Sequence, residues 1–257
     1  MNDPLKDEFL LYSQLLHDAL TIKIALPDEY YAYPDRLFPS IYLLDAAYFF
    51  DETPGILDEY LVRGEGMANI VRSLTQQGKI PATILIGIGY TEEQRSRFTL
   101  DEPDQFYEFF RKELIPAMES RYRVGLSSLD RLLFGYSGSA HFSTYALFAD
   151  IVNQIETFHR FVSISGVYFP DMAAVQLEEK CSQEHGSLSF SGRELYLAIG
   201  EDDPKTELLE SHRKFSSKLA SRNYQDLVLF TREFPGKGHY DIPEFAFREA
   251  LLQLSSS

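Results

Sequence analysis

A serine between small residues is the first feature of this chain that could do chemistry. Ser137 lies in the run Gly-Tyr-Ser-Gly-Ser at 135–139, after the short apolar run RLLF and before the helix-like stretch AHFSTYALF. A serine at a sharp turn between a strand and a helix projects its hydroxyl above the sheet, and that turn needs small neighbours. The first amides of the helix favour negative charge on the serine oxygen. The run therefore predicts a nucleophilic serine, although an ordinary glycine-rich turn would have the same local pattern.

A serine hydroxyl is a poor nucleophile unless a base activates it. His239 lies in the run GKGHYD at 236–241, between the last predicted strand and the last predicted helix. The two glycines give a loop that can bring the imidazole to Ser137. The other histidines are poorer candidates, and His141, one helical turn after Ser137, is better placed for packing or for lining a pocket. We therefore predict that His239 is the general base.

The acid that would orient this histidine is expected in the loop Gly-Glu-Asp-Asp-Pro at 200–204, which follows the predicted strand ELYLAI. A carboxylate there can accept the imidazole N–H, fix its tautomer and stabilise the imidazolium. The order serine, acid, histidine along the chain is that of the α/β-hydrolases. These residue types alone do not separate Glu201, Asp202 and Asp203, and each could instead serve a solvated turn or a helix N-cap.

The elements that must position these residues alternate in type along the whole chain. Apolar runs that predict strands cover 20–26, 40–46, 82–88, 131–134, 161–165, 194–199 and 227–231, and helical spacing covers 105–122, 208–219 and 243–254. Such alternation predicts a single α/β domain over residues 1–257, with a mostly parallel sheet and helices on both faces. Reactive loops then lie at the carboxyl ends of the strands. Residues 51–66 and 170–192 do not fit the alternation, so we expect insertions or lids near the site.

Composition excludes several other classes of protein. The 257 residues are 44% apolar, which suits a packed globule, and a net charge of −15 without any basic run argues against nucleic-acid binding. The lone Cys181 allows no intramolecular disulfide. The N-terminus lacks a signal-peptide pattern and no apolar stretch approaches the roughly 18 residues of a membrane span, so the cytoplasm is expected. No metal or cofactor motif is present. We expect a small-molecule ester as the partner, no nucleic acid or membrane, and an oligomeric state left open, a homodimer included.

From Ile22 to Leu254 the chain resembles the esterase family that includes esterase D-like S-formylglutathione hydrolases, feruloyl esterases and enterochelin esterases. The matching pieces are IYLLDAAYFF, ILIGIGY, FRKELIPAMESRYRV, RLLFGYSGSAHFSTYALF, FVSISG, LYLAIGEDDP and GKGHYD. The resemblance implies an α/β-hydrolase fold and hydrolysis of carboxylic esters through an acyl-enzyme. It places the nucleophile on Ser137, the base on His239 and the acid on Asp203, with Asp202 next in line.

The resemblance also implies an oxyanion hole made by the backbone amides of Gly138 and Ala46. Two positions depart from the family pattern there: Ala46 replaces the glycine of an Asp-Gly pair, and Ser139 replaces the last glycine of the elbow. We expect both changes to tighten the hole. Two alternatives to ester hydrolysis follow, namely hydrolysis of thioesters or peptides by the same residues, and a binding protein of this fold with impaired catalysis.

Overall fold

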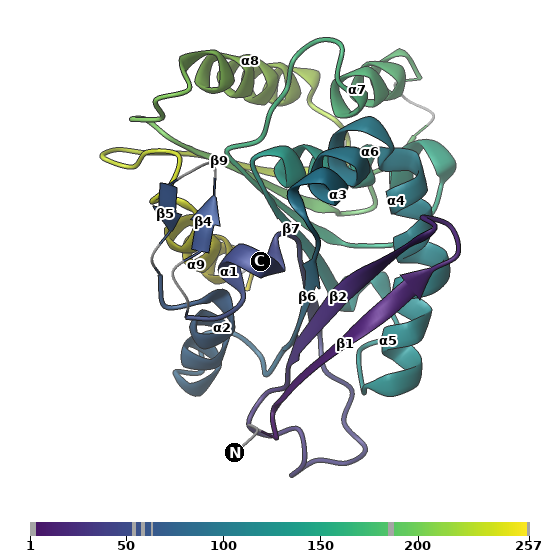
Figure 1. Cartoon of the computed structure of the whole chain (residues 1–257). Helices are drawn as coiled ribbons and strands as arrows, with labels where there is room; N and C mark the ends of the chain where they lie inside the picture. The colour runs from purple at the N-terminus through teal and green to yellow at the C-terminus, as the bar shows by residue number, and fades with distance from the viewer. Residues whose placement is uncertain (1–3, 53–54, 58–59, 63, 185–187, 256–257) are drawn as a thin grey trace.

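The computed structural model of this chain describes residues 4–52, 55–57, 60–62, 64–184 and 188–255. Its main sheet has eight strands in the order β1-β2-β6-β3-β7-β8-β9-β10 (Figure 1). These strands are β1 Lys6–Ser13, β2 Asp18–Ala25, β3 Ser40–Leu43, β6 Ile84–Gly89, β7 Arg131–Tyr136, β8 Arg160–Ile164, β9 Glu194–Gly200 and β10 Val228–Phe234. The pairs β1–β2 and β2–β6 are antiparallel, and all other pairs are parallel. This mostly parallel sheet confirms the predicted fold class.

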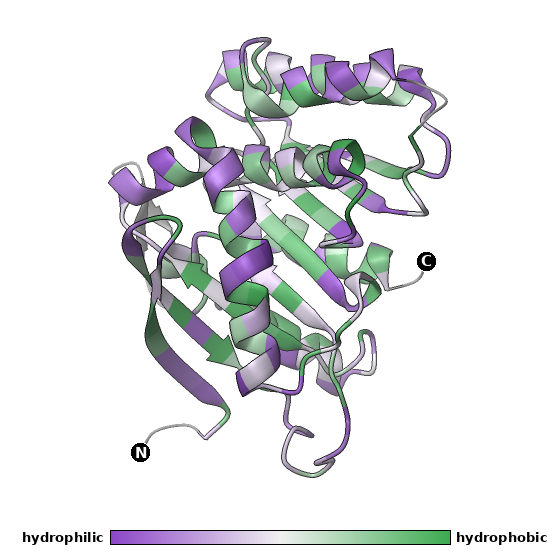
Figure 2. Cartoon of the chain, turned by 90° about the vertical axis from the view of Figure 1, so that its right-hand side faces the viewer, coloured by the Kyte–Doolittle hydropathy of each residue, from purple (hydrophilic) through white to green (hydrophobic). Residues whose placement is uncertain are grey.

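The central strands are apolar without alternation because helices cover both of their faces. Every residue of β6, β7 and β9 is buried, whereas β1 and β10, at the two edges of the sheet, are largely exposed. Figure 2 shows the same contrast: the central strands are mostly hydrophobic, and the outward faces of the helices are hydrophilic. The buried middle of the sheet is therefore a rigid support for the loops at its strand ends.

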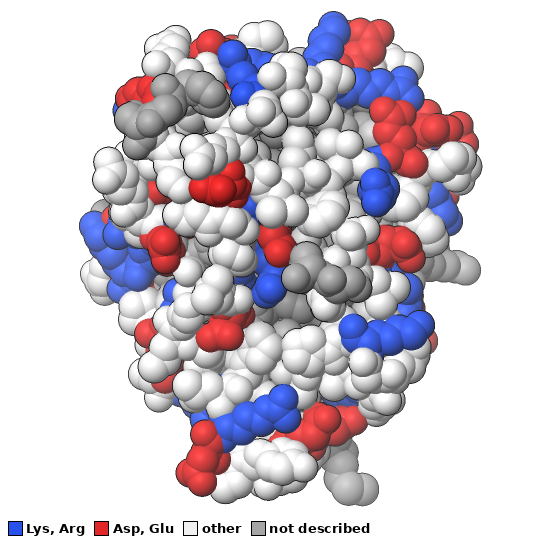
Figure 3. Space-filling view, turned by 180° about the vertical axis from the view of Figure 1, so that it is seen from behind, with Lys and Arg blue, Asp and Glu red and all other residues white. Residues whose placement is uncertain are grey.

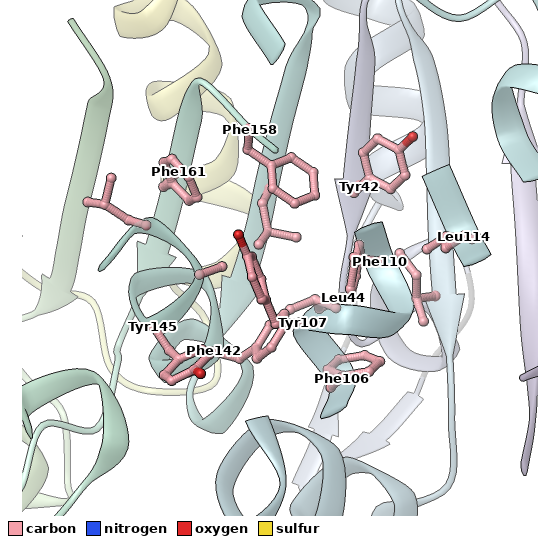
Figure 4. Packing of buried hydrophobic residues seen from close by; sticks show 14 of the residues in the cluster. Tyr42, Leu44, Phe106, Tyr107, Phe110, Leu114, Phe142, Tyr145, Phe158 and Phe161 are labelled. Atoms are coloured by element: carbon pink, nitrogen blue, oxygen red, sulfur yellow. The ribbon is translucent and has the colours of Figure 1, made fainter. Parts of the chain in front are cut away.

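Two layers of helices enclose the sheet. The first layer holds α3 Glu92–Ser96, α4 Pro103–Phe109, α5 Ile115–Arg121, α6 Gly138–Asn153, α7 Ala173–Gln183 and α8 Thr206–Arg222, and the second holds α1 Ala46–Phe49, α2 Met67–Gln76 and α9 Pro243–Leu254. An aromatic cluster fills the space between the first layer and the sheet (Figure 4). There the rings of Phe106 and Phe142 lie 4.7 Å apart and those of Tyr42 and Phe158 lie 5.4 Å apart. This packing fixes α6 against the sheet.

Some predicted boundaries were wrong. The strand predicted over 40–46 ends at Leu43, because Asp45 adopts a left-handed conformation (φ 59°) and Ala46 begins α1. The helix predicted over 105–122 is interrupted by a π-helical turn, Phe110–Leu114, which ends two residues before Pro116. Proline cannot donate to the preceding turn and its ring crowds the carbonyl four residues back, so a wider turn relieves the clash. The patterns also missed β1 and α2.

The two segments predicted as insertions contain secondary structure of their own. Residues 51–66 include the antiparallel pair β4 Gly55–Leu57 and β5 Tyr60–Val62, and residues 170–192 include α7. Residues 53–54, 58–59, 63 and 185–187 of these segments lie outside the described residues. The Glu244 carboxylate of α9 accepts hydrogen bonds from the Glu65 and Gly66 amides, at 3.0 and 2.9 Å, and so ties the end of the first segment to α9. Their role as lids stays a prediction.

Acidic and basic side chains are intermingled on the face of the molecule shown in Figure 3. Surface charges of the protein also form ion pairs, such as that between Arg213 and Glu233 at 2.7 Å. Screening by water and salt makes pairs of this kind weak contributors to stability. Over the described residues, no helix combines the length and apolarity needed to cross a membrane.

Candidate active site

Ser137 occupies the sharp turn between β7 and α6, as the sequence predicts. Its backbone lies at φ 56° and ψ −120°, an uncommon conformation for a residue with a side chain. The turn is held by a hydrogen bond of 2.9 Å from the Ser137 amide to the Ile164 carbonyl of the neighbouring strand β8. A Cβ on Gly135 would lie 2.1 Å from the Ser139 carbonyl oxygen, so only glycine there lets α6 start so close to β7. Ser137 itself is partly exposed.

The structure brings Asp203 and His239 together. His239 Nδ1 lies 2.8 Å from Asp203 Oδ2, and both side chains are fully buried. Because a carboxylate accepts hydrogen bonds, Nδ1 is the donor of this pair, and the neutral form of the imidazole has its lone pair on Nε2. Nε2 is buried and has no hydrogen-bond partner among the described residues. Glu201 and Asp202 are exposed, which separates Asp203 from its two neighbours.

The loop of the histidine is held against both the elbow and the loop of the acid. The Tyr136 hydroxyl, one residue before Ser137, donates a hydrogen bond of 2.5 Å to the His239 carbonyl. On the other side, the Lys237 carbonyl accepts a bond of 3.0 Å from the Asp202 amide. A Cβ on Gly200 would lie 2.1 Å from that same carbonyl oxygen. The three loops that carry the predicted residues therefore meet at the carboxyl ends of β7, β9 and β10.

The two predicted oxyanion donors are both first residues of helices. Ala46 begins α1 after β3, and Gly138 begins α6 after the neighbouring strand β7. Amides in the first turn of a helix have no acceptor within that helix. The positive end of the helix dipole also favours an anion beside them, above all at the 16-residue α6. These two backbones can thus supply donors to a developing oxyanion.

A buried ion pair behind this site was missed by sequence reasoning. Asp45 is 1% exposed, and its Oδ1 lies 2.7 Å from Nε of Arg95 in α3. Arg95 also donates a hydrogen bond of 3.1 Å from Nη2 to the Tyr136 carbonyl. Burial alone would lower the pKa of Arg95, but the adjacent Asp45 carboxylate outweighs it and holds that pKa above its ordinary value. Only the place of Asp45 beside Ala46, in the Asp-Gly pair of the family pattern, could have indicated a role here.

The amino-acid sequence shows which protein family this chain belongs to. The chain matches the family described as "Putative esterase" over residues 13–242. It belongs to this esterase family. The match confirms the predicted family and the predicted class of enzyme, a hydrolase of esters. No curated protein is significantly similar to the esterase in sequence.

Solved structures resemble the esterase over nearly its whole length. An IroE-like serine hydrolase from Shewanella oneidensis has a TM-score of 0.79 at 22% identity, with 98% of this chain and 80% of the other covered. The BES protein from Bacillus cereus gives 0.78 at 18% identity, with 99% and 96% covered. The enterobactin esterase FES from Shigella flexneri gives 0.73 at 18% identity, with 99% and 60% covered. At these identities the similarity shows the fold.

The buried side chains of His141 and Cys181 contribute to the packing of the esterase. His141 is fully buried, with Nδ1 3.2 Å from the Thr99 carbonyl and Nε2 accepting a bond of 3.0 Å from the Ala174 amide. Burial lowers the pKa of His141 to about 4, although the Thr99 carbonyl opposes that shift. Both ring nitrogens contact backbone groups of the interior, which agrees with the packing role predicted for His141. Burial, followed by the charge of Glu178, raises the pKa of the Cys181 thiol to about 12 and keeps it protonated.

Proposed function

We propose that this esterase hydrolyses carboxylic esters of small molecules by acyl transfer, with Ser137 as nucleophile, His239 as general base and Asp203 as the acid that orients the base. The observation that supports this most is the buried pair of His239 and Asp203, 2.8 Å apart, whose remaining imidazole nitrogen has no other partner in the described chain. A neutral, oriented imidazole with a free lone pair is what a serine nucleophile requires.

In the proposed reaction, His239 Nε2 takes the hydroxyl proton of Ser137 as the serine oxygen attacks the ester carbonyl. The carbonyl oxygen becomes an oxyanion, which the amides of Ala46 and Gly138 stabilise. When the tetrahedral intermediate collapses, the imidazolium returns the proton to the leaving alcohol and the acyl group stays on Ser137. Water, activated by the same imidazole, then releases the carboxylic acid. Asp203 stabilises the imidazolium in both halves of the cycle.

Two further classes of substrate fit the same residues. Thioesters and peptides react through the same tetrahedral intermediate, so their hydrolysis would need no other catalytic group. Several proteins of similar fold carry siderophore names, including the enterobactin esterase FES and the siderophore hydrolase EstA from Aspergillus nidulans. A substrate panel should therefore contain aryl esters, acyl thioesters, sugar esters and a catechol siderophore ester. A binding protein with impaired catalysis would turn over none of them.

The test is this panel run on the wild-type protein beside Ser137→Ala, with Ser143→Ala as the control. Ser143 is a buried serine of α6, the helix that follows Ser137, and its hydroxyl donates a hydrogen bond of 3.2 Å to the Leu133 carbonyl. Loss of the nucleophile should lower kcat on p-nitrophenyl acetate by about a millionfold. A fluorophosphonate probe, which reacts rapidly with an activated serine, should label the wild-type protein at Ser137 alone. A Ser137→Ala protein that keeps more than about a tenth of the wild-type rate would refute the assignment.

A further inference from the structure

Ser139 and Ala46 depart from the family pattern of glycine, and in the structure the Ser139 hydroxyl contacts two buried side chains. The Ser139 side chain is fully buried, and its Oγ lies 3.0 Å from Asp45 Oδ1 and 2.8 Å from the Tyr90 hydroxyl. Asp45 is the residue before Ala46, and Ser139 is the residue after Gly138. The contact therefore joins the two backbones that carry the proposed oxyanion donors.

We propose that Ser139 is a positioning residue that, together with Tyr90, holds the Asp45–Ala46 backbone at a fixed distance from the start of α6. The inference rests on the proposed function, because it concerns the geometry of that oxyanion hole. Neither hydroxyl needs to touch the substrate. Their effect on turnover would pass through the backbone amides of Ala46 and Gly138.

The conformation of Asp45 explains why such support is needed. With φ 59° and ψ 32°, Asp45 lies in the left-handed region, which most residues with a side chain avoid and which aspartate tolerates better than most. The Asp45 side chain does not cap helix α1, which begins at the next residue. A glycine after the aspartate would leave this turn freer, whereas alanine at position 46 narrows the accessible backbone conformations. The Ala46 amide can face the substrate only while this turn is maintained.

Tyr90 holds Asp45 through both its main chain and its side chain. The Asp45 amide donates to the Tyr90 hydroxyl oxygen at 3.1 Å, and that hydroxyl lies 3.0 Å from Asp45 Oδ1. Burial, reinforced by the charge of Asp45, raises the pKa of Tyr90 well above its ordinary value, so the phenol keeps its proton. Ser139 closes the set by contacting both groups. Asp45 Oδ1 thus lies within hydrogen-bond distance of Arg95, Tyr90 and Ser139.

The experiment compares Ser139→Ala, Tyr90→Phe and the double variant by steady-state kinetics on p-nitrophenyl acetate. Rates are expressed per active site from the acylation burst, so that misfolded protein does not count. We expect Ser139→Ala to lower kcat about tenfold with KM within twofold, since the donors act on the transition state. The double variant should lose little more than the worse single variant, because both side chains act through Asp45.

Two further measurements separate positioning from a general packing defect. The Ki of a trifluoromethyl ketone, whose tetrahedral adduct carries an oxyanion, should rise in proportion to the loss of kcat/KM. Ser143→Ala, which removes a buried hydroxyl of α6 outside this set, should stay within twofold of wild type. If Ser139→Ala does not fold, Ser139→Gly and Tyr90→Phe take its place, with the same expectations.

A per-site kcat of Ser139→Ala within twofold of wild type would overturn the inference, as would an equal loss in Ser143→Ala. Additive losses in the double variant would also count against it. If the wild-type protein is not acylated at Ser137, the proposed function fails, and this inference fails with it. If it is acylated and Ser139→Ala turns over normally, only the inference fails.

Discussion

Gly200→Ala should reduce activity by displacing the loop of the histidine while leaving the fold intact. Gly200 ends β9, three residues before Asp203, and an added Cβ would lie 2.1 Å from the Lys237 carbonyl oxygen. Ordinary contact begins at 3.4 Å, so the two backbones must separate by about 1.3 Å (3.4 − 2.1). Lys237 is two residues from His239. A misplacement of about 1 Å at a catalytic group costs on the order of 100-fold in rate.

We therefore expect kcat/KM of Gly200→Ala on p-nitrophenyl acetate to fall about 100-fold. The far-ultraviolet circular dichroism spectrum of this variant should match that of the wild-type protein. Overpacking of this kind should lower the free energy of unfolding by about 1–3 kcal/mol. The matched control is Gly89→Ala at the end of β6, where the nearest atoms to an added Cβ lie at 3.4 Å. Its activity should remain close to that of the wild-type protein. A folded Gly200→Ala protein with more than half of the wild-type kcat/KM would refute the argument.

Two more predictions concern the acid and a buried histidine. Asp203→Asn should lower kcat on p-nitrophenyl acetate on the order of 10⁴-fold, because Asp203 is the carboxylate that contacts His239. Asp202 is exposed, so kcat of Asp202→Asn should be close to that of the wild-type protein. Equal losses in the two variants would contradict the assignment of Asp203 as the acid. Burial lowers the pKa of His141 to about 4 in the folded protein, whereas its ordinary value in the unfolded chain is 6.5. The unfolded state therefore binds more protons between these two values. As a result, the free energy of unfolding falls as the pH drops below about 6.5. Between pH 8 and pH 5 His141 should account for a loss of about 2 kcal/mol. The buried His212, whose pKa is also lowered to about 4 by burial, adds a loss of its own, so the variants must be compared with one another. Urea unfolding at both pH values should show a loss in wild type and in His17→Gln, an exposed control, that exceeds the loss in His141→Gln by about 2 kcal/mol. Equal losses in all three proteins would refute the explanation.

Local patterns were enough to predict the fold class and the loops that carry Ser137 and His239. Runs of buried apolar residues mark parallel strands because both faces of such strands are covered, and this is visible within a few neighbouring residues. The elbow around Ser137 and the glycine-flanked His239 are also local, since small residues are required at those turns themselves. The same reasoning overextended β3, because nothing in the residues up to Ala46 shows that Asp45 turns into the left-handed region.

The family resemblance favoured Asp203, but only the tertiary structure gave a physical reason to separate it from Asp202, and only the tertiary structure revealed the group of Asp45, Tyr90 and Ser139. Adjacent acids have the same chemistry, and which of them is buried against His239 depends on how β9 and β10 pair and on how their loops interlock. Asp45, Tyr90 and Ser139 follow the three strands β3, β6 and β7 and are brought together only because β3 lies between β6 and β7. Side-chain burial and hydrogen-bond partners are set by contacts between segments distant along the chain, whereas the periodicity that predicts strands and helices is set by near neighbours.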